Sequence, residues 1–349
     1  MPWSSVCITA FCHSRSFLLA VVEGVRPPKM APPRHGRYTV EPVTFQSEGV
    51  ELVGNLYLPQ GGDVSKAPAV AILGPFCYVK EQAPVQYATR LADEGFVALA
   101  FDCRTHGASK GEPRRLEEPQ NKVVDLGSAI EFLKSRPEVD ADKIAALGVC
   151  EGASEVMVAA ASNPNIKAAA VVSGHYREHD NDVALIGGLE LLGGEIKVEE
   201  AEARLQQRSE KAKAALEKYQ ATGEVEYIPI VDPLRKDVGL PWKPIWDWYH
   251  GWADRGIWEN RVALMSYVRY MEFESLNAGA AQLKVPTIMI HGEFSDGPPS
   301  AYKHFETIAS EKKKLVKEDG VNHFQFYEDP AVIDKAVGNA AEFLLEHLG

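Results

Sequence analysis

Cysteine is scarce in this chain of 349 residues, and its spacing is not that of a structural site. The five cysteines are an odd number, with no C-x-x-C motif and no spacing typical of zinc ligands. The sequence therefore predicts neither a secreted disulfide framework nor a metal site, and we expect no metal and no other cofactor. We expect a reducing, cytoplasmic setting, which suits a free thiol that acts as a nucleophile.

Positive charge and long apolar runs are also in short supply. The 37 Lys and Arg face 49 Asp and Glu, giving a net charge of −12, which argues against nucleic acid or an anionic membrane as a partner. The apolar run at residues 17–22 is too short to cross a bilayer. We expect residues 1–37 to be a disordered leader, because residues 27–33 are proline-rich. A signal peptide and a true start at Met30 stay open as alternatives.

The rest of the chain alternates predicted strands with predicted helices. A hairpin at 38–45 and 50–58 precedes apolar strands at 67–73, 96–101, 143–149, 166–172, 287–290 and 313–316. Helices are expected at 81–94, 120–135, 300–308 and 331–347. This alternation is typical of an α/β fold, and it predicts a mostly parallel, eight-stranded sheet with helices on both faces.

The alternation stops near residue 174 and resumes at 285. We predict a core in two parts, 38–174 and 285–349, separated by an inserted helical lid at 175–284, because this segment far exceeds an ordinary connection. Within it, residues 198–219 and 257–274 have helical patterns, and five of the six tryptophans lie between 242 and 258. These aromatic rings either pack the lid internally or line an apolar substrate pocket. We expect five aromatic residues to bind substrate, with His175 beside them: Tyr78, Tyr176, Trp246, Trp248 and Tyr249.

One short turn carries the chemistry. Residues 148–152 read Gly-Val-Cys-Glu-Gly between a predicted strand and a predicted helix. This is the nucleophile-elbow pattern with Cys150 in the place of the more common serine. The flanking glycines let strand and helix approach closely, and the turn holds the thiol at the carboxyl end of the sheet. The alternative is a structural cysteine buried ahead of a packed helix.

Two further residues complete a catalytic order. Asp296 follows a late strand and His323 lies past the final one, so Cys150, Asp296 and His323 follow the chain order of α/β-hydrolase triads. His323 would take the proton of the thiol, and Asp296 would orient the imidazole. Glu293 is an alternative acid, and His323 could also be an ordinary surface histidine. We expect activity to fall as His323 takes up a proton below neutral pH.

An oxyanion hole needs two backbone donors. We expect the N–H groups of Glu151 and Phe76, since Pro75 has none, with Cys77 as the next choice. A carboxylate beside the nucleophile disfavours a thiolate, so Glu151 either faces solvent, which we prefer, or acts as a second acid or base. A polar cluster after residue 101 is expected to tie loops together: Asp102, Arg104, His106, Gly107 and Ser109.

At these motifs the chain resembles the α/β-hydrolases related to dienelactone hydrolase, in particular the YcjY-like group, and it is similar to fungal polyketide transferases. The resemblance runs from about residue 43 to the end and rests on residues 79–82, 102–115, 148–152 and 246–249. It implies a Cys-Asp-His triad at Cys150, Asp296 and His323. Ala153 stands where the group often has a further glycine, and the long lid departs from the compact dienelactone hydrolases.

Three functions follow as hypotheses. The first is a hydrolase that cleaves an ester, thioester or lactone, plausibly of a polyketide or other apolar acyl substrate, through an acyl-Cys150 intermediate. The second is an acyltransferase or polyketide-releasing enzyme that passes the acyl group to an acceptor other than water. The third is a non-catalytic small-molecule binding protein on the same fold. The expected partner is a small acyl substrate, free or carrier-bound, and a homodimer stays open.

Overall fold

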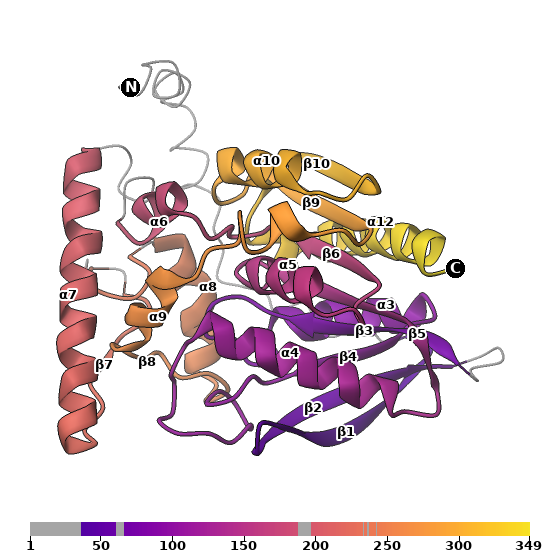
Figure 1. The fold of residues 1–349 in the computed structure, drawn as a ribbon, viewed down its shortest axis with the longest axis horizontal. Helices are drawn as coiled ribbons and strands as arrows, with labels where there is room; N and C mark the ends of the chain where they lie inside the picture. Colours follow the sequence, from indigo (N-terminus) through magenta and orange to yellow (C-terminus); the bar gives the residue numbers. More distant parts are fainter. Residues whose placement is uncertain (1–35, 61–65, 188–196, 233, 236, 242) are drawn as a thin grey trace.

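A single eight-stranded sheet forms the centre of the computed structural model, which describes residues 36–60, 66–187, 197–232, 234–235, 237–241 and 243–349 (Figure 1). Its strand order is β1-β2-β4-β3-β5-β6-β9-β10. The strands are β1 (Tyr38–Ser47), β2 (Val50–Pro59), β3 (Ala67–Leu73), β4 (Val97–Phe101), β5 (Val139–Val149), β6 (Ala168–Val172), β9 (Thr287–Phe294) and β10 (Lys313–Asn322). β2 runs antiparallel to β1 and β4, and the other neighbours are parallel, which confirms the predicted sheet. The predicted leader lies almost wholly outside the described residues.

Helices cover both faces of this sheet. α3 (Ala83–Asp93) and α12 (Pro330–Leu348) contact each other on one face, and α4 (Pro119–Lys134) and α5 (Gly152–Ser162) do so on the other. The remaining helices after the predicted lid are α10 (Pro298–Thr307) and α11 (Gln325–Glu328), and η1 (Ala280–Gln282), the last element of the predicted lid segment, packs against α5 and α10 of the core. A proline stands in the first turn of α3, α4, α10 and α12, where its missing N–H leaves no helical hydrogen bond unmade. Among the described helices, none is long and apolar enough to span a membrane.

The apolar run of β3 shows why the chain folds this way. Ala69, Ala71 and Leu73 belong to the core cluster under α4 and α5. Val70 and Ile72, which alternate with them, belong to the cluster under α3 and α12. Since successive side chains of a strand point to opposite faces, a strand that is buried on both sides must be apolar at every position.

The predicted lid segment forms a separate layer at one end of the sheet (Figure 1). It contains α6 (His179–Leu185), α7 (Val198–Thr222), β7 (Tyr227–Ile228), α8 (Lys243–Ala253), β8 (Val262–Ala263) and α9 (Ser266–Glu272). The single helix expected at 257–274 is wrong, because residues 257–265 form bends, turns and the short strand β8, and only α9 is helical. There Asn260 accepts the N–H groups of Ile230 and Val231 at 3.0 and 2.9 Å, and β8 pairs with β7. These pairings override the local helical pattern.

Candidate active site

Cys150 occupies a strained turn between β5 and α5. Its φ is 57°, in the left-handed region that side chains rarely adopt. The flanking glycines make the turn possible: a Cβ on Gly148 would lie 2.1 Å from the carbonyl oxygen of Gly152, and one on Gly152 would lie 2.8 Å from that of Leu73. The N–H of Cys150 donates to Val172 O at 3.1 Å, which ties the turn to β6. The thiol is therefore held at the carboxyl end of the sheet.

The backbone N–H groups of Phe76 and Glu151 lie beside the thiol and lack an oxygen acceptor among the described residues. Phe76 and Glu151 line one small cavity with Cys150. Among the hydrogen bonds of the described residues, the N–H of Phe76 has no acceptor and that of Glu151 meets only the Cys150 sulfur. The N–H of Cys77, in contrast, donates to Glu117 Oε1 at 3.0 Å and is thereby engaged. This arrangement leaves Phe76 and Glu151 as the pair that could hold an oxyanion.

Lid side chains fix the loop that carries Phe76. The hydroxyl of Tyr249 donates to Phe76 O at 2.7 Å, and Nε1 of Trp258 donates to Cys77 O at 2.7 Å. Cys77 itself has a φ of 53°, so these bonds hold a loop that is strained. Two lid rings thus set the peptide planes of the loop, which is a role that the tryptophan spacing does not reveal.

The aromatic residues predicted to bind substrate lie in different places. Tyr249 lines the cavity. Trp248 packs edge-on against Tyr327 at 5.0 Å, whereas Trp246 stacks on His250 at 5.0 Å. Tyr78 is buried in the core with its hydroxyl 3.3 Å from Cys103 Sγ, and Tyr176 packs against His304 at 5.0 Å. Tyr78, Tyr176, Trp246 and Trp248 are not among the residues that line the cavity.

His323 reaches the thiol through a tyrosine. Its Nε2 lies 2.6 Å from the hydroxyl of Tyr327, and Tyr327 lines the same small cavity as Cys150, whose thiol pKa it lowers. Its Nδ1 lies 3.0 Å from Ser173 Oγ and 3.3 Å from the backbone N of Asp296. Ser173 follows β6 with a φ of 45°, so a second strained residue helps to place the imidazole. Cys150, Tyr327, His323 and Ser173 form one connected chain.

The Asp296 carboxylate does not contact His323 as expected. Its Oδ2 lies 2.5 Å from Nδ1 of His175, and Asn181 Nδ2 lies 3.0 Å from the same nitrogen. Burial would raise the pKa of Asp296, but His175 outweighs it and holds that pKa below its usual value. The alternative acid, Glu293, accepts the N–H of Gly320 at 2.8 Å and lies outside the cavity. Of the two candidate acids, Asp296 and not Glu293 lines the cavity. Its carboxylate, however, binds His175 and not His323.

Burial shifts the pKa values of Cys150 and His323 in opposite directions. It raises the pKa of the Cys150 thiol to about 12, against the Tyr327 hydrogen bond, which lowers it. It lowers the pKa of His323 to about 4, although the Asp296 charge opposes the shift. Near neutral pH the pair is therefore a thiol and a neutral imidazole. The expected loss of activity just below neutral pH must be corrected, since His323 stays unprotonated to much lower pH.

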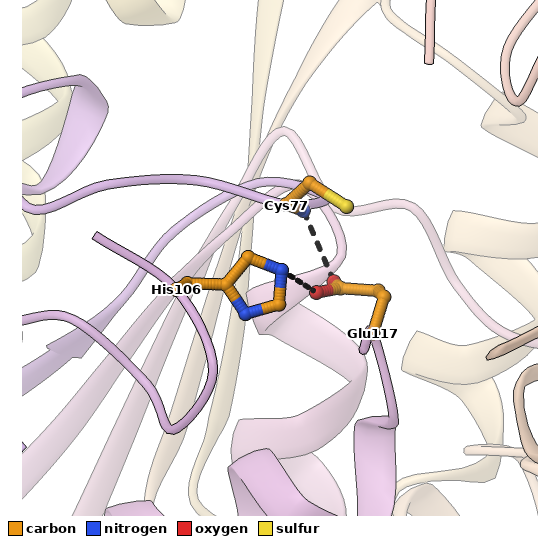
Figure 2. Close-up of side chains that lie close together, drawn as sticks. All are labelled: Cys77, His106 and Glu117. Atoms are coloured by element: carbon orange, nitrogen blue, oxygen red, sulfur yellow. Dashed lines mark hydrogen bonds and ion pairs between the residues drawn. The ribbon is translucent and has the colours of Figure 1, made fainter. Parts of the chain in front are cut away.

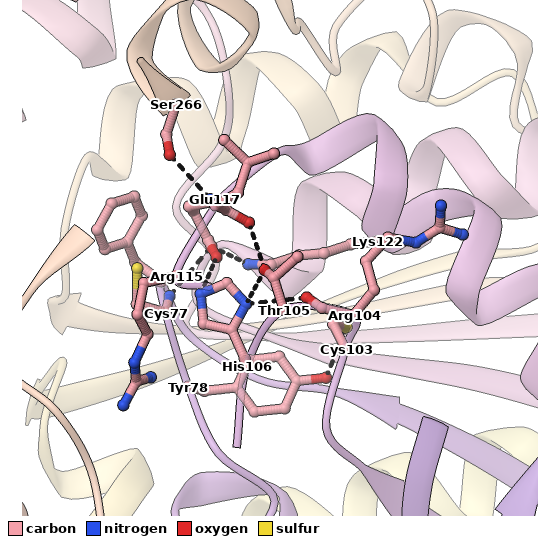
Figure 3. A network of polar contacts seen from close by, with 12 residues as sticks. Cys77, Tyr78, Cys103, Arg104, Thr105, His106, Arg115, Glu117, Lys122 and Ser266 are labelled. Carbon is pink, nitrogen blue, oxygen red and sulfur yellow. Dashed lines mark hydrogen bonds and ion pairs between the residues drawn. The ribbon is translucent and has the colours of Figure 1, made fainter. Parts of the chain in front are cut away.

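Glu151 does not face solvent, and that preferred interpretation is wrong. It is fully buried, with Oε2 3.1 Å from Nζ of Lys122, which also pairs with Glu117 and lies 3.7 Å from Glu155 (Figure 3 shows Lys122 beside Glu117). Burial raises the pKa of Glu151 to about 7, although the Lys122 ammonium lowers it. Burial also raises the pKa of Glu155, and the uptake of a proton by Glu151 or Glu155 reduces the repulsion of a thiolate at Cys150.

Part of this network has the donor set of a metal site. Sγ of Cys77, a ring nitrogen of His106 and a carboxylate oxygen of Glu117 lie within 4.8 Å of one another (Figure 2). The other oxygen of Glu117, however, already binds Lys122 and the N–H of Cys77. Burial lowers the pKa of His106 to about 3, so the ring is neutral. These contacts give Glu117 a structural role: it holds the loop at 74–78 by binding the N–H of Cys77.

The rest of the polar cluster after β4 connects loops, as the sequence analysis expected. Asp102 accepts the N–H groups of Lys80 and Ala108 at 2.7 and 2.9 Å. Arg104 binds Asp125 at 2.7 Å. None of these side chains is among the residues that line the cavity.

The cavity over Cys150 is small and mostly apolar. Its volume is about 30 Å³, room for about one water molecule. Beside the polar groups already described, it is lined by Pro75, Phe76, Leu185, Leu240, Ile245, Tyr249, Tyr270, Phe324 and Tyr327. No Lys or Arg is among the described residues that line it. Leu240, Ile245 and Tyr249 come from the segment predicted to be a lid, which therefore forms part of the cavity wall.

Several site residues escaped the sequence analysis. Tyr327 stands four residues after His323, a spacing that places both on one face of a helical turn, so a signal was present. Ser173, the last residue before the lid, and Lys122, 29 residues before Glu151, carry no local signal of their roles.

A family comparison agrees with this geometry. The family model described as X-Pro dipeptidyl-peptidase (S15 family) matches residues 48–325, which is most of the chain. The chain belongs to the S15 peptidase family. Its fold and relatives make it an enzyme of the hydrolase or acyltransferase type, so the hypothesis of a non-catalytic binding protein is not supported.

This S15-family chain has relatives of several kinds. It is 26% identical over 302 residues to the uncharacterized protein YcjY of Escherichia coli K12, covering 86% of this chain and 95% of YcjY. It is 34% identical over 122 residues to the polyketide transferase claH of Penicillium crustosum, covering 35% and 40% of the two chains. Over 120 residues it is 29% identical to the thiohydrolase aneE of Aspergillus aculeatus, covering 34% and 36%. The predicted resemblance to YcjY-like and fungal polyketide enzymes is confirmed.

Solved structures show the same fold. A hypothetical protein of Pseudomonas aeruginosa, PA2218, superposes with a TM-score of 0.73 at 25% identity, over 90% of this chain and 95% of PA2218. The α/β hydrolase GrgF of Penicillium sp. sh18 gives a TM-score of 0.73 at 22% identity, over 89% and 99%. The α/β-hydrolase fold predicted for the S15-family chain is confirmed.

Proposed function

We propose that this protein is an acyl-transfer enzyme in which the sulfur of Cys150 forms a thioester with the acyl group of its substrate. The observation that carries the proposal is the left-handed Cys150 in one cavity with Phe76 and Glu151, whose N–H groups have no oxygen acceptor among the hydrogen bonds of the described residues. Attack on a carbonyl carbon moves negative charge onto the carbonyl oxygen, and two backbone donors at that point stabilise it. His323 is the base, and Asp296 supplies the negative charge that stabilises its cation.

The cavity favours a neutral, apolar acyl group. Apolar and aromatic side chains make up most of its wall, with no Lys or Arg among the described lining residues to pair with an anionic substrate. Its carboxyl groups are engaged as well, Asp296 with His175 and Glu151 with Lys122. The ammonium group of a peptide N-terminus therefore has no free partner there, so an ester, thioester or lactone suits the site better than a peptide. The printed names of the thiohydrolase and polyketide transferase relatives agree with this class.

The second substrate is water in a hydrolase and another nucleophile in an acyltransferase. The cavity of about 30 Å³ favours the acyltransferase in one respect, since a closed lid keeps bulk water from the thioester. Hydrolysis needs only one water molecule, which this space can hold.

Product analysis separates the two reactions. The enzyme is incubated with p-nitrophenyl esters and acyl thioesters of increasing chain length, with and without alcohol, amine and thiol acceptors. We expect a burst of p-nitrophenol equal to the enzyme concentration, which is absent from Cys150→Ala. A steady state that yields free acid whatever the acceptor identifies a hydrolase, whereas a transfer product identifies an acyltransferase. Equal turnover by the wild type and Cys150→Ala would refute the proposal.

A further inference from the structure

Cys150 and His323 are joined by the hydroxyl group of a third residue. Among the hydrogen bonds of the described residues, none runs directly between the thiol and the imidazole. The Tyr327 hydroxyl lies 2.6 Å from His323 Nε2, and Tyr327, His323 and Cys150 line the same small cavity, where Tyr327 is the polar neighbour that lowers the pKa of the thiol against its burial. We propose that Tyr327 is a catalytic residue that carries the proton from the Cys150 sulfur to His323. The inference rests on the proposed function, because it concerns the same nucleophile.

Tyr327 is held firmly enough to serve as such a bridge. Its side chain is buried, and its ring packs edge-on against Trp248 at 5.0 Å and against Phe324 at 5.7 Å. The His323 and Tyr327 ring centroids are 5.2 Å apart. A phenol hydroxyl donates one hydrogen bond and accepts another, as a relay requires.

The surroundings of His323 allow its Nε2 to receive the proton. Nδ1 faces two groups, Ser173 Oγ at 3.0 Å and the backbone N–H of Asp296 at 3.3 Å. The relay uses the tautomer protonated at Nδ1, in which Nδ1–H donates to Ser173 Oγ, the longer contact from the Asp296 N–H is not made, and Nε2 is the acceptor. Ser173 Oγ lies in turn 2.9 Å from Ser295 Oγ, so the chain of hydroxyl groups continues. When Nε2 gains the proton, the Asp296 charge nearby stabilises the imidazolium.

The proposed step balances in atoms and charge. The S–H bond of Cys150 breaks, its proton passes to Tyr327 Oη, and the proton of Tyr327 passes to His323 Nε2. The sulfur electron pair forms the bond to the acyl carbon, and the carbonyl oxygen becomes an oxyanion held by the N–H groups of Phe76 and Glu151. When the oxyanion collapses, the bond to the leaving oxygen or sulfur breaks. The leaving group takes the proton from His323, and Cys150 remains as a thioester.

Alkylation of the thiol tests the relay without an acyl substrate. The rate at which iodoacetamide modifies Cys150 is measured by peptide mapping from pH 6 to 10, for the wild type and for Tyr327→Phe. We expect the variant to react on the order of 100-fold more slowly at pH 7, because it loses assisted proton transfer. The gap should shrink toward pH 10, where hydroxide removes the proton. If the variant reacts as fast as the wild type, or faster, the Tyr327 hydroxyl only shields the thiol from the reagent, and the proposal is overturned.

Tyr87→Phe is the matched control. The Tyr87 hydroxyl donates to Phe326 O at 2.9 Å, so its loss disturbs α11 but not the chain from Cys150 to His323. We expect wild-type alkylation from this variant; equal slowing in both variants would mean that a displaced α11 is the cause, and the proposal would fall. If Tyr327→Phe does not fold, the solvent isotope effect on wild-type alkylation decides. A curved dependence on deuterium fraction indicates two protons in motion, and a linear one contradicts the relay.

The two proposals fail differently. If the proposed function is wrong, acyl compounds leave no adduct on Cys150, while alkylation still depends on Tyr327. If only the relay is wrong, acyl adducts form and Tyr327→Phe alkylates at the wild-type rate.

Discussion

The Oδ2 atom of Asp296 lies 2.5 Å from Nδ1 of His175, whereas only the backbone N–H of Asp296 faces His323, at 3.3 Å from its Nδ1. One acid thus serves two imidazoles through different groups. The contact with His175 lowers the pKa of the buried carboxylate, and the charge of Asp296 raises the pKa of His323 against the effect of burial. Asp296 therefore acts on His323 through its charge, whereas its carboxylate hydrogen-bonds the other imidazole.

Substitution of Asp296 should separate it from Glu293. We expect Asp296→Asn to lower kcat on the order of 100-fold or more, because the imidazolium at His323 loses its counter-charge. Glu293→Gln is the control: among the contacts of the described residues, its carboxylate binds the Gly320 N–H and no side chain, so the variant should keep kcat within about twofold of the wild type. Steady-state kinetics with the best ester substrate checks both. A larger loss in Glu293→Gln than in Asp296→Asn would assign the acid to Glu293.

The pH dependence of activity should follow the buried His323. Its pKa of about 4 lies below the ordinary 6.5, so the free enzyme keeps a neutral base as the pH falls. We expect kcat/KM to stay nearly constant from pH 7 to about pH 5 and to decline below that. The same shift contributes on the order of 3 kcal/mol of folding stability above pH 6.5, which is lost as the pH falls toward 4. Rates from pH 4 to 8, with unfolding curves at each pH, test this; an activity midpoint near 6.5 would contradict it.

Lys122 should be essential to the fold because it is the ammonium between three buried carboxyl groups, Glu117, Glu151 and Glu155. We expect Lys122→Met to lower the free energy of unfolding by about 3–5 kcal/mol at pH 8, since the carboxylates lose their counter-charge. The loss should be smaller at pH 5. A carboxyl group with a raised pKa, such as Glu151 at about 7, stabilises the fold below its unfolded value of 4.5, and that contribution is lost as the pH rises through 7.

Lys134→Met, at the other end of α4, is the matched control for Lys122. Its ammonium makes a partly exposed contact of 3.2 Å with Glu131. Such surface pairs contribute about 0–1 kcal/mol, so urea unfolding should barely change. Equal effects of the two substitutions would show that Lys122 is not the centre of a buried network.

Gly148 is the glycine of the elbow least able to accept a side chain. Its Cβ would meet the backbone oxygen of Gly152 at 2.1 Å, and neither backbone can move without breaking the turn. We expect Gly148→Ala to yield insoluble or inactive protein. Gly338→Ala, in the middle of α12 with nothing within 4 Å of the new Cβ, should instead stabilise the chain by roughly 0.5–1 kcal/mol. Thermal unfolding of both variants checks the contrast, and a well-folded, active Gly148→Ala would refute the strained elbow.

The features that the sequence predicted are those with local causes. Strand formation by apolar runs, helix initiation at prolines and the tight turn at Cys150 with its two glycines depend on residues close together in the sequence. The eight-stranded sheet could therefore be predicted from the sequence. Glu151 shows the limit of this approach. A carboxylate in a sequence is expected to be exposed, and only the fold brings Lys122 to it from another helix.

Orientation could not be read from the chain either. Asp296 lies within reach of two imidazoles, and which of them its carboxylate binds depends on the path of the loop after β6. The tryptophan spacing likewise left two alternatives open. Trp258 turned out to bind Cys77 O, and Trp248 to support the ring of Tyr327. Such contacts join segments far apart in the sequence, where periodicity carries no information.

Mass spectrometry of Cys150 tests the central claim most directly. The protein is mixed with an apolar acyl thioester, stopped in acid within the first turnover, digested and mapped. The account predicts the mass of the acyl group on the peptide that contains Cys150 and its removal by hydroxylamine, with no such adduct in Cys150→Ala. Turnover of the thioester with no increment on Cys150 at any time, or an adduct on another residue that survives in Cys150→Ala, would contradict it.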